Sequence, residues 1–279
     1  MLSINSLHSN FISNNLSSIQ QQTTQNIQRM STGNRINSAR DDAAGLYVAK
    51  GMETQISGLN VANQNAKEGL SITQTAEGAL DVIQTNLDRL NELAIRSANG
   101  TINDDVRAGL QTEADEIIAE IQRITENTEY GGKELLSTNA EDIKIHVGTT
   151  SDASISSGIH AGGLQDFASG TAIETILTTG DFDISTQAAA QGNIDTVSSS
   201  IDKVSELRAN LGASMNRFES VMTNNNTMST NLEQARSRIM DVDYAKETAA
   251  FAKNQLLQQV NASVLAQANA NSQLVLQLL

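Results

Sequence analysis

The sequence predicts a mainly α protein, a long helical hairpin or coiled-coil bundle with a small β region at its turn. Three observations predict this fold. The 279 residues contain no proline, so no pyrrolidine ring breaks a long helix. Apolar residues recur at alternating steps of three and four in both halves of the chain. Between the halves, glycines punctuate a stretch in which apolar and polar residues alternate.

The two ends of the chain lack charged side chains. Residues 1–28 and 254–279 contain no Asp, Glu, Lys or Arg, yet each end has an apolar stripe at helical spacing. We expect two terminal helices that supply each other's apolar partners and also pair with other copies, because either helix alone leaves its stripe in water. Unstructured tails are the alternative, and such tails rarely keep a stripe. The residues predicted to drive polymerisation are Ile4, Leu7, Phe11, Leu16, Ile19, Leu256, Leu257, Val260, Val264 and Leu265.

The first half of the chain predicts two further helices. Residues 42–98 keep to coiled-coil spacing, which predicts one long helix. Asn99-Gly100 is expected to end it, since both residues tolerate the left-handed cap conformation. Asn103 is suited to cap the next helix, which carries acidic residues in its first turn and stops near residues 130–132.

The second half returns as helices after the β region. Residues 139–187 predict short strands, an exposed position and tolerance of insertion. Helical spacing resumes near Ala188, and Asp241-Val242-Asp243 begins a last helix. The predicted domains are a terminal-helix domain, a helical core domain, and a β-hairpin region within the core domain. Their boundaries are 1–36 with 241–279, 37–138 with 188–240, and 139–187, respectively.

Composition and motifs exclude several function classes. A net charge of -14 disfavours nucleic acid and anionic membrane surfaces as partners, and no apolar run is long enough for membrane insertion. The histidines, His8, His146 and His160, lack metal-ligand spacing, and nucleophile and phosphate-binding motifs are absent. Capping explains Asp241 and Asp243 better than calcium does, since an EF-hand loop is absent. We therefore expect no enzyme activity, no cofactor and no metal.

Several motifs resemble the bacterial flagellins, in a short form without large outer domains. The strongest is RINSARDDAAG at residues 35–45, which resembles the signature that follows the first terminal helix of that family. Others occupy residues 77–80, 93–99, 130–136, 237–245 and 263–269. A chance match of so many motifs in order is negligible. The last ten residues depart from the family, because many relatives have a proline there and a terminal arginine, and this chain has neither.

The resemblance implies a structural subunit that polymerises into the flagellar filament outside the bacterial cell and serves motility. The terminal helices would line the inner tube of the filament, and the middle helices would form its outer tube. The subunit would leave unfolded through the flagellar type III export system, which agrees with the missing signal-peptide pattern at the start. Its partners would be copies of itself, an export chaperone, cap proteins and hook-associated junction proteins.

The resemblance also implies recognition by the flagellin-sensing Toll-like receptor of animal hosts. In flagellins that this receptor detects, an Arg and a Leu on the long helix and a Glu on the next helix carry recognition. The matching positions are Arg89, Leu93 and Glu113. Spacing places Arg89, Leu93 and Arg96 beside the core stripe, so Leu93 is expected at the surface. The same face could also pack against the next subunit.

Two alternative functions stay open at this point. A hook–filament junction protein would share the terminal helices, although the 35–45 signature and the 263–269 motif favour a flagellin. A cytoplasmic signalling bundle of the chemoreceptor type would need charged heptad flanks and a membrane span. The charge-free ends argue against that second alternative.

Overall fold

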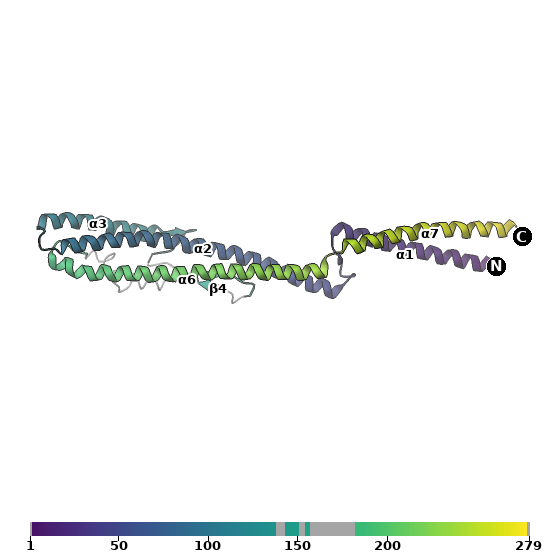
Figure 1. Cartoon of the computed structure of the whole chain (residues 1–279), viewed down its shortest axis with the longest axis horizontal. Helices are drawn as coiled ribbons and strands as arrows, with labels where there is room; N and C mark the ends of the chain where they lie inside the picture. Colours follow the sequence, from purple (N-terminus) through teal and green to yellow (C-terminus); the bar gives the residue numbers. More distant parts are fainter. Residues whose placement is uncertain (1, 138–142, 151–153, 157–181, 278–279) are drawn as a thin grey trace. The chain divides into compact units, whose positions relative to one another are not determined.

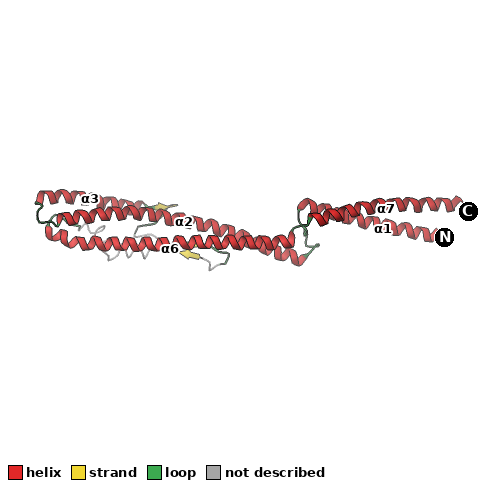
Figure 2. Ribbon diagram, in the orientation of Figure 1, coloured by secondary structure: helices red, strands yellow, loops and turns green. Residues whose placement is uncertain are grey.

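The computed structural model describes the chain except residues 1, 138–142, 151–153, 157–181 and 278–279. The helices are α1 (Leu2–Thr32), α2 (Ala43–Ser97), α3 (Asp104–Asn127), α6 (Gln187–Met240) and α7 (Tyr244–Gln277) (Figure 1). The strands are β1 (Glu129–Tyr130), β2 (Lys133–Glu134), β3 (Lys144–His146) and β4 (Ser154–Ser156) (Figure 2). The mainly α fold with a small strand region is confirmed. None of the described helices combines the length and apolar character that crossing a membrane requires.

The chain divides into two compact units. The terminal unit comprises residues 1–56 and 230–279, and the core unit comprises residues 57–229. The divisions fall inside α2 and α6, whereas the predicted domain boundaries lie near residues 36 and 241. The beginning of α2 and the end of α6 join the terminal unit because they bond to the segment between α1 and α2. The assignment of each unit to an inner or outer tube stays a prediction.

A large apolar cluster and a smaller one, made of Ala66, Val147 and Phe218, hold the core unit together. Helices α2, α3 and α6 lie side by side there (Figure 1), and each contributes its heptad residues to the large cluster. Burying a leucine or isoleucine side chain in this way stabilises the fold by about 1.5–3 kcal/mol. The members from the three helices include Leu80, Ile83, Leu87, Leu90, Leu110, Ala114, Ile121, Val197, Val204 and Leu211.

The turn between α2 and α3 confirms one cap and corrects another. Asn103 has an extended backbone and its side chain accepts from the Val106 N–H at 3.1 Å, as predicted. Gly100, in contrast, is not among the glycines with a positive φ, so the predicted left-handed cap is wrong. Instead, the Asn99 side chain accepts from the Thr101 N–H at 3.1 Å. A side-chain turn therefore takes the place of a glycine cap.

Helix α3 ends before the predicted stop, and a tight hairpin follows it. Gly131 and Gly132 have φ values of 60° and 78° and connect β1 to β2. Positive φ at both central residues is the requirement of a type I′ turn, which matches the twist of a two-stranded hairpin. The motif at residues 130–136 is thus a two-glycine hairpin.

The predicted β region is partly confirmed and partly corrected. Strands β3 and β4 pair antiparallel, with Ile145 opposite Ile155. The expectation of an exposed region is wrong for three of its described residues, because Val147, Phe182 and Ile184 are buried. The Asn225 side chain also donates to the Val147 carbonyl at 3.0 Å. These parts of the segment belong to the core, and insertions there would disturb it; its remaining expected strands lie outside the described residues.

Candidate assembly surface

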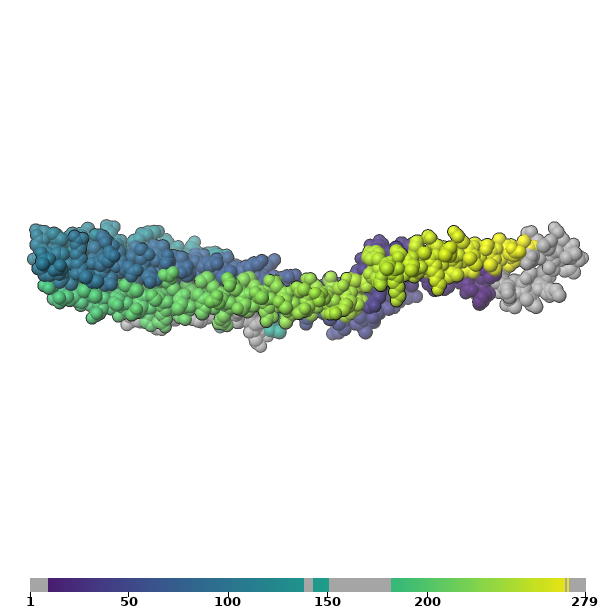
Figure 3. All heavy atoms as spheres, in the orientation of Figure 1, coloured from purple at the N-terminus to yellow at the C-terminus, as the bar shows by residue number. Residues whose placement is uncertain are grey.

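Helices α1 and α7 run antiparallel, side by side, and form most of the terminal unit (Figure 1). On the face that Figure 3 shows, α7 covers much of α1. Specific bonds connect the pair along its length. The Tyr244 hydroxyl donates to the Met30 carbonyl at 3.0 Å, and the Gln258 amide donates to the Thr23 hydroxyl at 3.0 Å.

The seam between α1 and α7 mixes apolar and polar residues. Asn26 and Asn254 are each only 7% exposed. The Asn26 amide, oriented to satisfy its neighbours, donates at 3.0 Å to the Glu247 carboxylate, which also lies 3.9 Å from Arg29. Among the side chains described in both helices, Ile12 is the buried apolar residue. Buried amides at coiled-coil positions specify register at some expense of stability.

Both sides of this seam follow heptad spacing. The buried and half-buried positions of each helix are separated by alternating steps of four and three. The apolar residues alone did not reveal the full pattern, because the heptads continue through polar positions such as Asn26, Asn254 and Gln258. The signal in the chain is the spacing of apolar and polar seam residues together. The seam positions are 12, 16, 19, 23, 26 and 30 in α1, and 247, 251, 254, 258, 261, 265 and 268 in α7.

The outer side of α7 carries an apolar stripe. Leu256, Val260 and Val264 lie four residues apart and are 64%, 54% and 45% exposed, and Leu257 is beside them. The expectation that the two terminal helices supply each other's apolar partners is therefore wrong for these four residues. We call Leu256, Leu257, Val260 and Val264 the α7 stripe. It is an exposed apolar patch within residues 254–279, which contain no charged side chain.

The other predicted polymerisation residues fall into three groups. Phe11 is exposed on α1. Leu16, Ile19 and Leu265 are half-buried in the seam. Ile4 and Leu7 lie in α1, but their side chains lie outside the described residues. The predicted set thus mixes seam residues with outward-facing residues, which have different roles in assembly.

The signature at residues 35–45 joins the ends of three helices within the terminal unit. Gly33, at a φ of 73°, ends α1, and its carbonyl accepts from the Val242 N–H at 2.9 Å. The Arg35 guanidinium donates to the Ile239 carbonyl at 2.6 Å, which binds the last turn of α6. These bonds fix the point at which the chain passes from α6 into α7.

Two aspartates hold the rest of the signature in shape. The Asp41 carboxylate accepts from the N–H groups of Asn37 and Ser38 and from the Ser38 hydroxyl, and these bonds lower the pKa of Asp41. Asp42 caps α2 by accepting from the Gly45 N–H at 2.9 Å. A Cβ on residue 45 would lie 2.9 Å from the Cδ1 atom of buried Ile36, so this position requires glycine.

The structure separates the three residues expected to contact a host receptor. Arg89 donates to Glu113 at 2.6 Å and to Glu92 at 2.9 Å, and the Glu113 bond is the main cause of a raised Arg89 pKa. Leu93 is 1% exposed and belongs to the apolar core, so its expected surface position is wrong. Leu93 is buried because α2 packs in the same cluster as both α3 and the Phe182–Ile184 segment.

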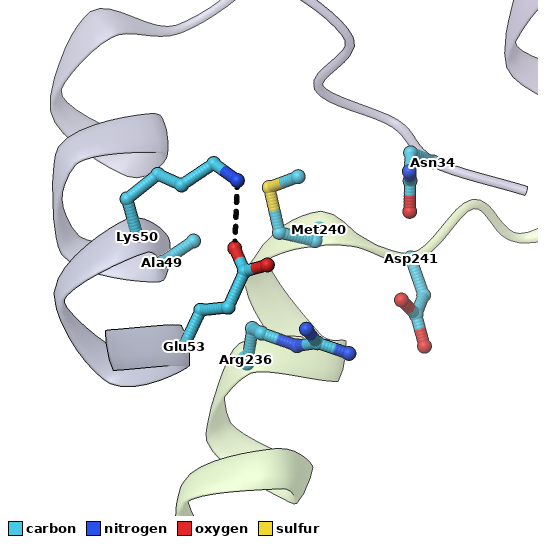
Figure 4. Close-up of a pocket in the computed structure, with 7 residues that line it drawn as sticks. All are labelled: Asn34, Ala49, Lys50, Glu53, Arg236, Met240 and Asp241. Carbon is cyan, nitrogen blue, oxygen red and sulfur yellow. Dashed lines mark hydrogen bonds and ion pairs between the residues drawn. The ribbon is translucent and has the colours of Figure 1, made fainter. Parts of the chain in front are cut away.

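A pocket of about 200 Å³ also lies in the terminal unit (Figure 4). Its walls come from the segment after α1, the beginning of α2 and the end of α6. Among the described residues, no cluster of His, Asp or Glu could hold a metal ion. The lining residues are Asn34, Ala49, Lys50, Glu53, Arg236, Met240 and Asp241.

Comparison with protein families gives two matches. Residues 4–141 match the bacterial flagellin N-terminal helical region, and residues 194–279 match the bacterial flagellin C-terminal helical region. A flagellin from Halalkalibacterium halodurans is 40% identical over 253 residues, covering 91% of this chain and 90% of the relative. A flagellin from Bacillus subtilis is 37% identical and covers 95% of each chain.

A solved structure shares the fold at lower identity. It is a Vibrio parahaemolyticus protein described as flagellar hook-associated, 15% identical, with a TM-score of 0.51. The likeness covers 72% of this chain and 97% of that one. At this identity the likeness concerns the fold alone.

Proposed function

The chain belongs to the bacterial flagellin family, and on that premise we propose that it polymerises through the apolar side chains that α1 and α7 leave outside their own pair. As a member of this family it is a structural subunit of the extracellular flagellar filament. The α7 stripe is the observation that supports the proposed surface. Four exposed apolar side chains in the charge-free part of α7 are buried only if another molecule covers them.

The seam and the α7 stripe make different contacts in the proposed assembly. The buried amides of the seam set the register of α1 against α7 within one chain, and the stripe supplies apolar area between chains. Burying the exposed part of each stripe residue stabilises a contact by roughly 25 cal/mol per Å² of apolar surface. The gain repeats in every subunit, so small side chains suffice to hold a long polymer.

The α7 stripe also supports the proposal of an export chaperone. Before assembly, Leu256 and Val260 would face water, and an apolar patch of this kind favours aggregation. We propose that a flagellar export chaperone covers the stripe during passage through the type III system. Cap proteins and hook-associated junction proteins would then contact the same terminal helices in the assembled filament.

A hook–filament junction role is the alternative function. The hook-associated protein has the same fold at 15% sequence identity, which does not decide the role of this chain. Identity of 40% to a flagellin, over nine tenths of both chains, favours the filament subunit. Many tubes of unlimited length would support the filament subunit, whereas short end-capping assemblies would support the junction role.

Recognition by the host Toll-like receptor is a second proposal, and it rests on Arg89 and Glu113. Both side chains are about half exposed and lie against each other on adjacent helices, so one partner could contact both. Leu93 is buried and would contribute by positioning Arg89. Arg89→Ala should lower receptor activation by monomer about tenfold or more. A loss of receptor activation on Leu93→Ala would support the proposal only if the variant stays folded.

Electron microscopy of purified chain tests the main proposal. Wild type should form long tubes, and Val260→Asp should not, because an unpaired carboxylate at a buried contact costs several kcal/mol. Gln259→Asp is the matched control, since it adds the same charge at an exposed neighbouring position outside the stripe. Tubes from Val260→Asp as abundant as those from wild type would refute the surface.

A further inference from the structure

Charge is distributed very unevenly between the two units. The terminal unit contains eight basic and seven acidic residues, a formal net charge of +1. The core unit contains the remaining ten basic and 25 acidic residues, a formal net charge of -15. A polymer of this chain therefore brings many strongly acidic bodies together, and unbalanced repulsion between them would oppose assembly.

The carboxylates of the terminal unit are already bound locally. Asp41, Asp42 and Asp243 accept from backbone N–H groups, Asp241 accepts from the Ser237 hydroxyl, and Glu247 lies against Asn26 and Arg29. The remaining two are Glu53, which pairs with Lys50, and Glu233, which also has a partner. Each carboxylate of the unit thus has a partner of its own.

Several cations of the same unit make no hydrogen bond or ion pair among the described residues. The net charge of the unit stays +1, because hydrogen bonds from neutral donors do not cancel the charge of its carboxylates. Such unpaired guanidinium and ammonium groups can pair with carboxylates from outside the unit. The cations of the terminal unit without such a bond are Arg40, Arg236, Arg238, Lys246 and Lys253.

Arg236 differs from the other four because it lines a pocket. Its side chain is half-buried at the wall formed by α6, across from the beginning of α2 (Figure 4). In Figure 4 the drawn bond joins Lys50 to Glu53, at 2.7 Å, and this bond is the first cause of the lowered pKa of Glu53. Arg236 has no drawn bond, and its charge also lowers the pKa of Glu53 from across the pocket. The pocket volume of about 200 Å³ leaves room for an incoming side chain. A planar guanidinium there presents its donors in a fork that fits a carboxylate.

The core unit supplies carboxylates that lack partners. Exposed acids on α2, α3 and α6, such as Asp88, Glu116 and Glu219, make no hydrogen bond or ion pair among the described residues. Their side chains are free to enter a pocket on another molecule. The charges of the two units are therefore complementary between copies, which is the arrangement that a head-to-tail polymer needs.

We propose that the Arg236 pocket of one subunit receives a carboxylate from the core unit of a neighbouring subunit. The inference rests on the proposed self-assembly and adds an electrostatic contact to the apolar one. The contact joins unlike surfaces, so it favours an open helical array over a closed dimer. It also sets the orientation of incoming subunits, because charge complementarity acts before apolar surfaces meet.

Substitution of Arg236 tests the proposal in the full-length chain. Arg236→Gln should raise the critical concentration for polymerisation about tenfold at low salt, and Arg236→Lys should restore most of the loss. Arg217→Gln is the matched control, because Arg217 is an exposed, unpaired arginine on the same helix in the core unit. An unchanged thermal transition in each variant would show that the subunits stay folded.

Cross-linking identifies the partner of residue 236. A carbodiimide joins a lysine amine to an adjacent carboxylate, with loss of water, so it can trap Arg236→Lys in filaments grown from mixed 14N and 15N subunits. Mixed-isotope peptides that join position 236 to an acidic residue within 57–229 are expected, and Arg217→Lys should give far fewer. Mixed-isotope links from 236 that fall outside 57–229, or none, would overturn the inference.

The results of these experiments distinguish failure of the Arg236 contact from failure of the proposed function on which it rests. If wild type forms no filaments, the proposed function fails and this contact fails with it. If wild type forms filaments and Arg236→Gln does so at the same concentration, only the Arg236 contact is overturned.

Discussion

The two units bury different mixtures of residues where their helices meet. In the core unit, Leu80, Leu87 and Leu90 are almost fully buried in a cluster shared by three helices. In the terminal unit, Asn26 and Asn254 share the seam with apolar residues such as Ile12, while the α7 stripe faces outward. The core unit therefore holds its own apolar core, whereas the proposed assembly would cover the apolar surface that the terminal unit leaves exposed. Heptad spacing thus holds the helices of each unit together, and the residues outside the heptads of α7 form the proposed contact between chains.

Removing residues 254–279 should have the largest effect on this comparison. The deletion takes away half of the seam and the whole α7 stripe, so we expect no filaments by electron microscopy. The core unit should stay folded, and hydrogen exchange should show unchanged protection for α2 and α3 between residues 80 and 125. Normal filaments from the truncated chain would contradict this difference between the units. Unfolding of the core unit in the truncated chain would contradict it as well.

Leu90→Ala should strongly destabilise the monomer. Leu90 is fully buried, and truncating such a side chain costs about 2–5 kcal/mol, measured by urea unfolding. Leu256→Ala is the matched change in the terminal unit and should leave the unfolding midpoint of the core unchanged while raising the critical concentration for polymerisation. Equal loss of monomer stability in both variants would contradict the view that the α7 stripe is free before assembly.

Asn103→Ala should have a smaller effect that stays within the core unit. Loss of the α3 cap should lower stability by about 1 kcal/mol, seen as a lower thermal midpoint, because the Val106 N–H loses its acceptor. Asn103→Asp keeps an acceptor at the same place and should match wild type. If the alanine variant also matches wild type, the cap adds nothing measurable to this unit.

The smallest of these effects is expected in acid, where the signature segment at residues 35–45 should become less stable. Hydrogen bonds from Asn37 and Ser38 hold the folded pKa of Asp41 below its ordinary value of about 3.9. Their stabilisation is present above that ordinary value and is lost as the pH falls through the lowered pKa. Hydrogen exchange of residues 33–45, corrected for intrinsic rates, should therefore increase in strong acid. Asp41→Asn should show little of this dependence.

The long helices could be predicted because their periodicity extends over many turns. The predicted segment 42–98 differs from α2 by one residue at each end, and Asn103 caps α3 as expected. Leu93 was misplaced because a single stripe assumes one partner, whereas α2 shares its cluster with α3, α6 and the Phe182–Ile184 segment. The second buried flank of α2 depends on residues distant in sequence, so local spacing could not reveal it.

The helices that carry the proposed assembly surface were predicted, and the orientation of their side chains was predicted only in part. Charge-free ends with helical spacing identified α1 and α7, and all of the candidate residues lie on them. The prediction placed every apolar residue against the partner helix, which is wrong for the α7 stripe. At the seam, bonds such as Gln258 to Thr23 accompany apolar contacts, and hydrophobicity alone cannot identify such a mixed side.

The antiparallel direction of α1 and α7 has an electrostatic consequence. Every α-helix has a partial positive charge at its first turn and a partial negative charge at its last turn. In this pair the beginning of α1 lies on the same side as the end of α7, so the partial charges of one helix offset those of the other (Figure 1). The macrodipoles therefore cancel without side chains such as aspartate or lysine, which helps to explain how 28 and 26 terminal residues dispense with charge entirely. The termini can approach other copies without the like-charge repulsion that a capped helix end would bring.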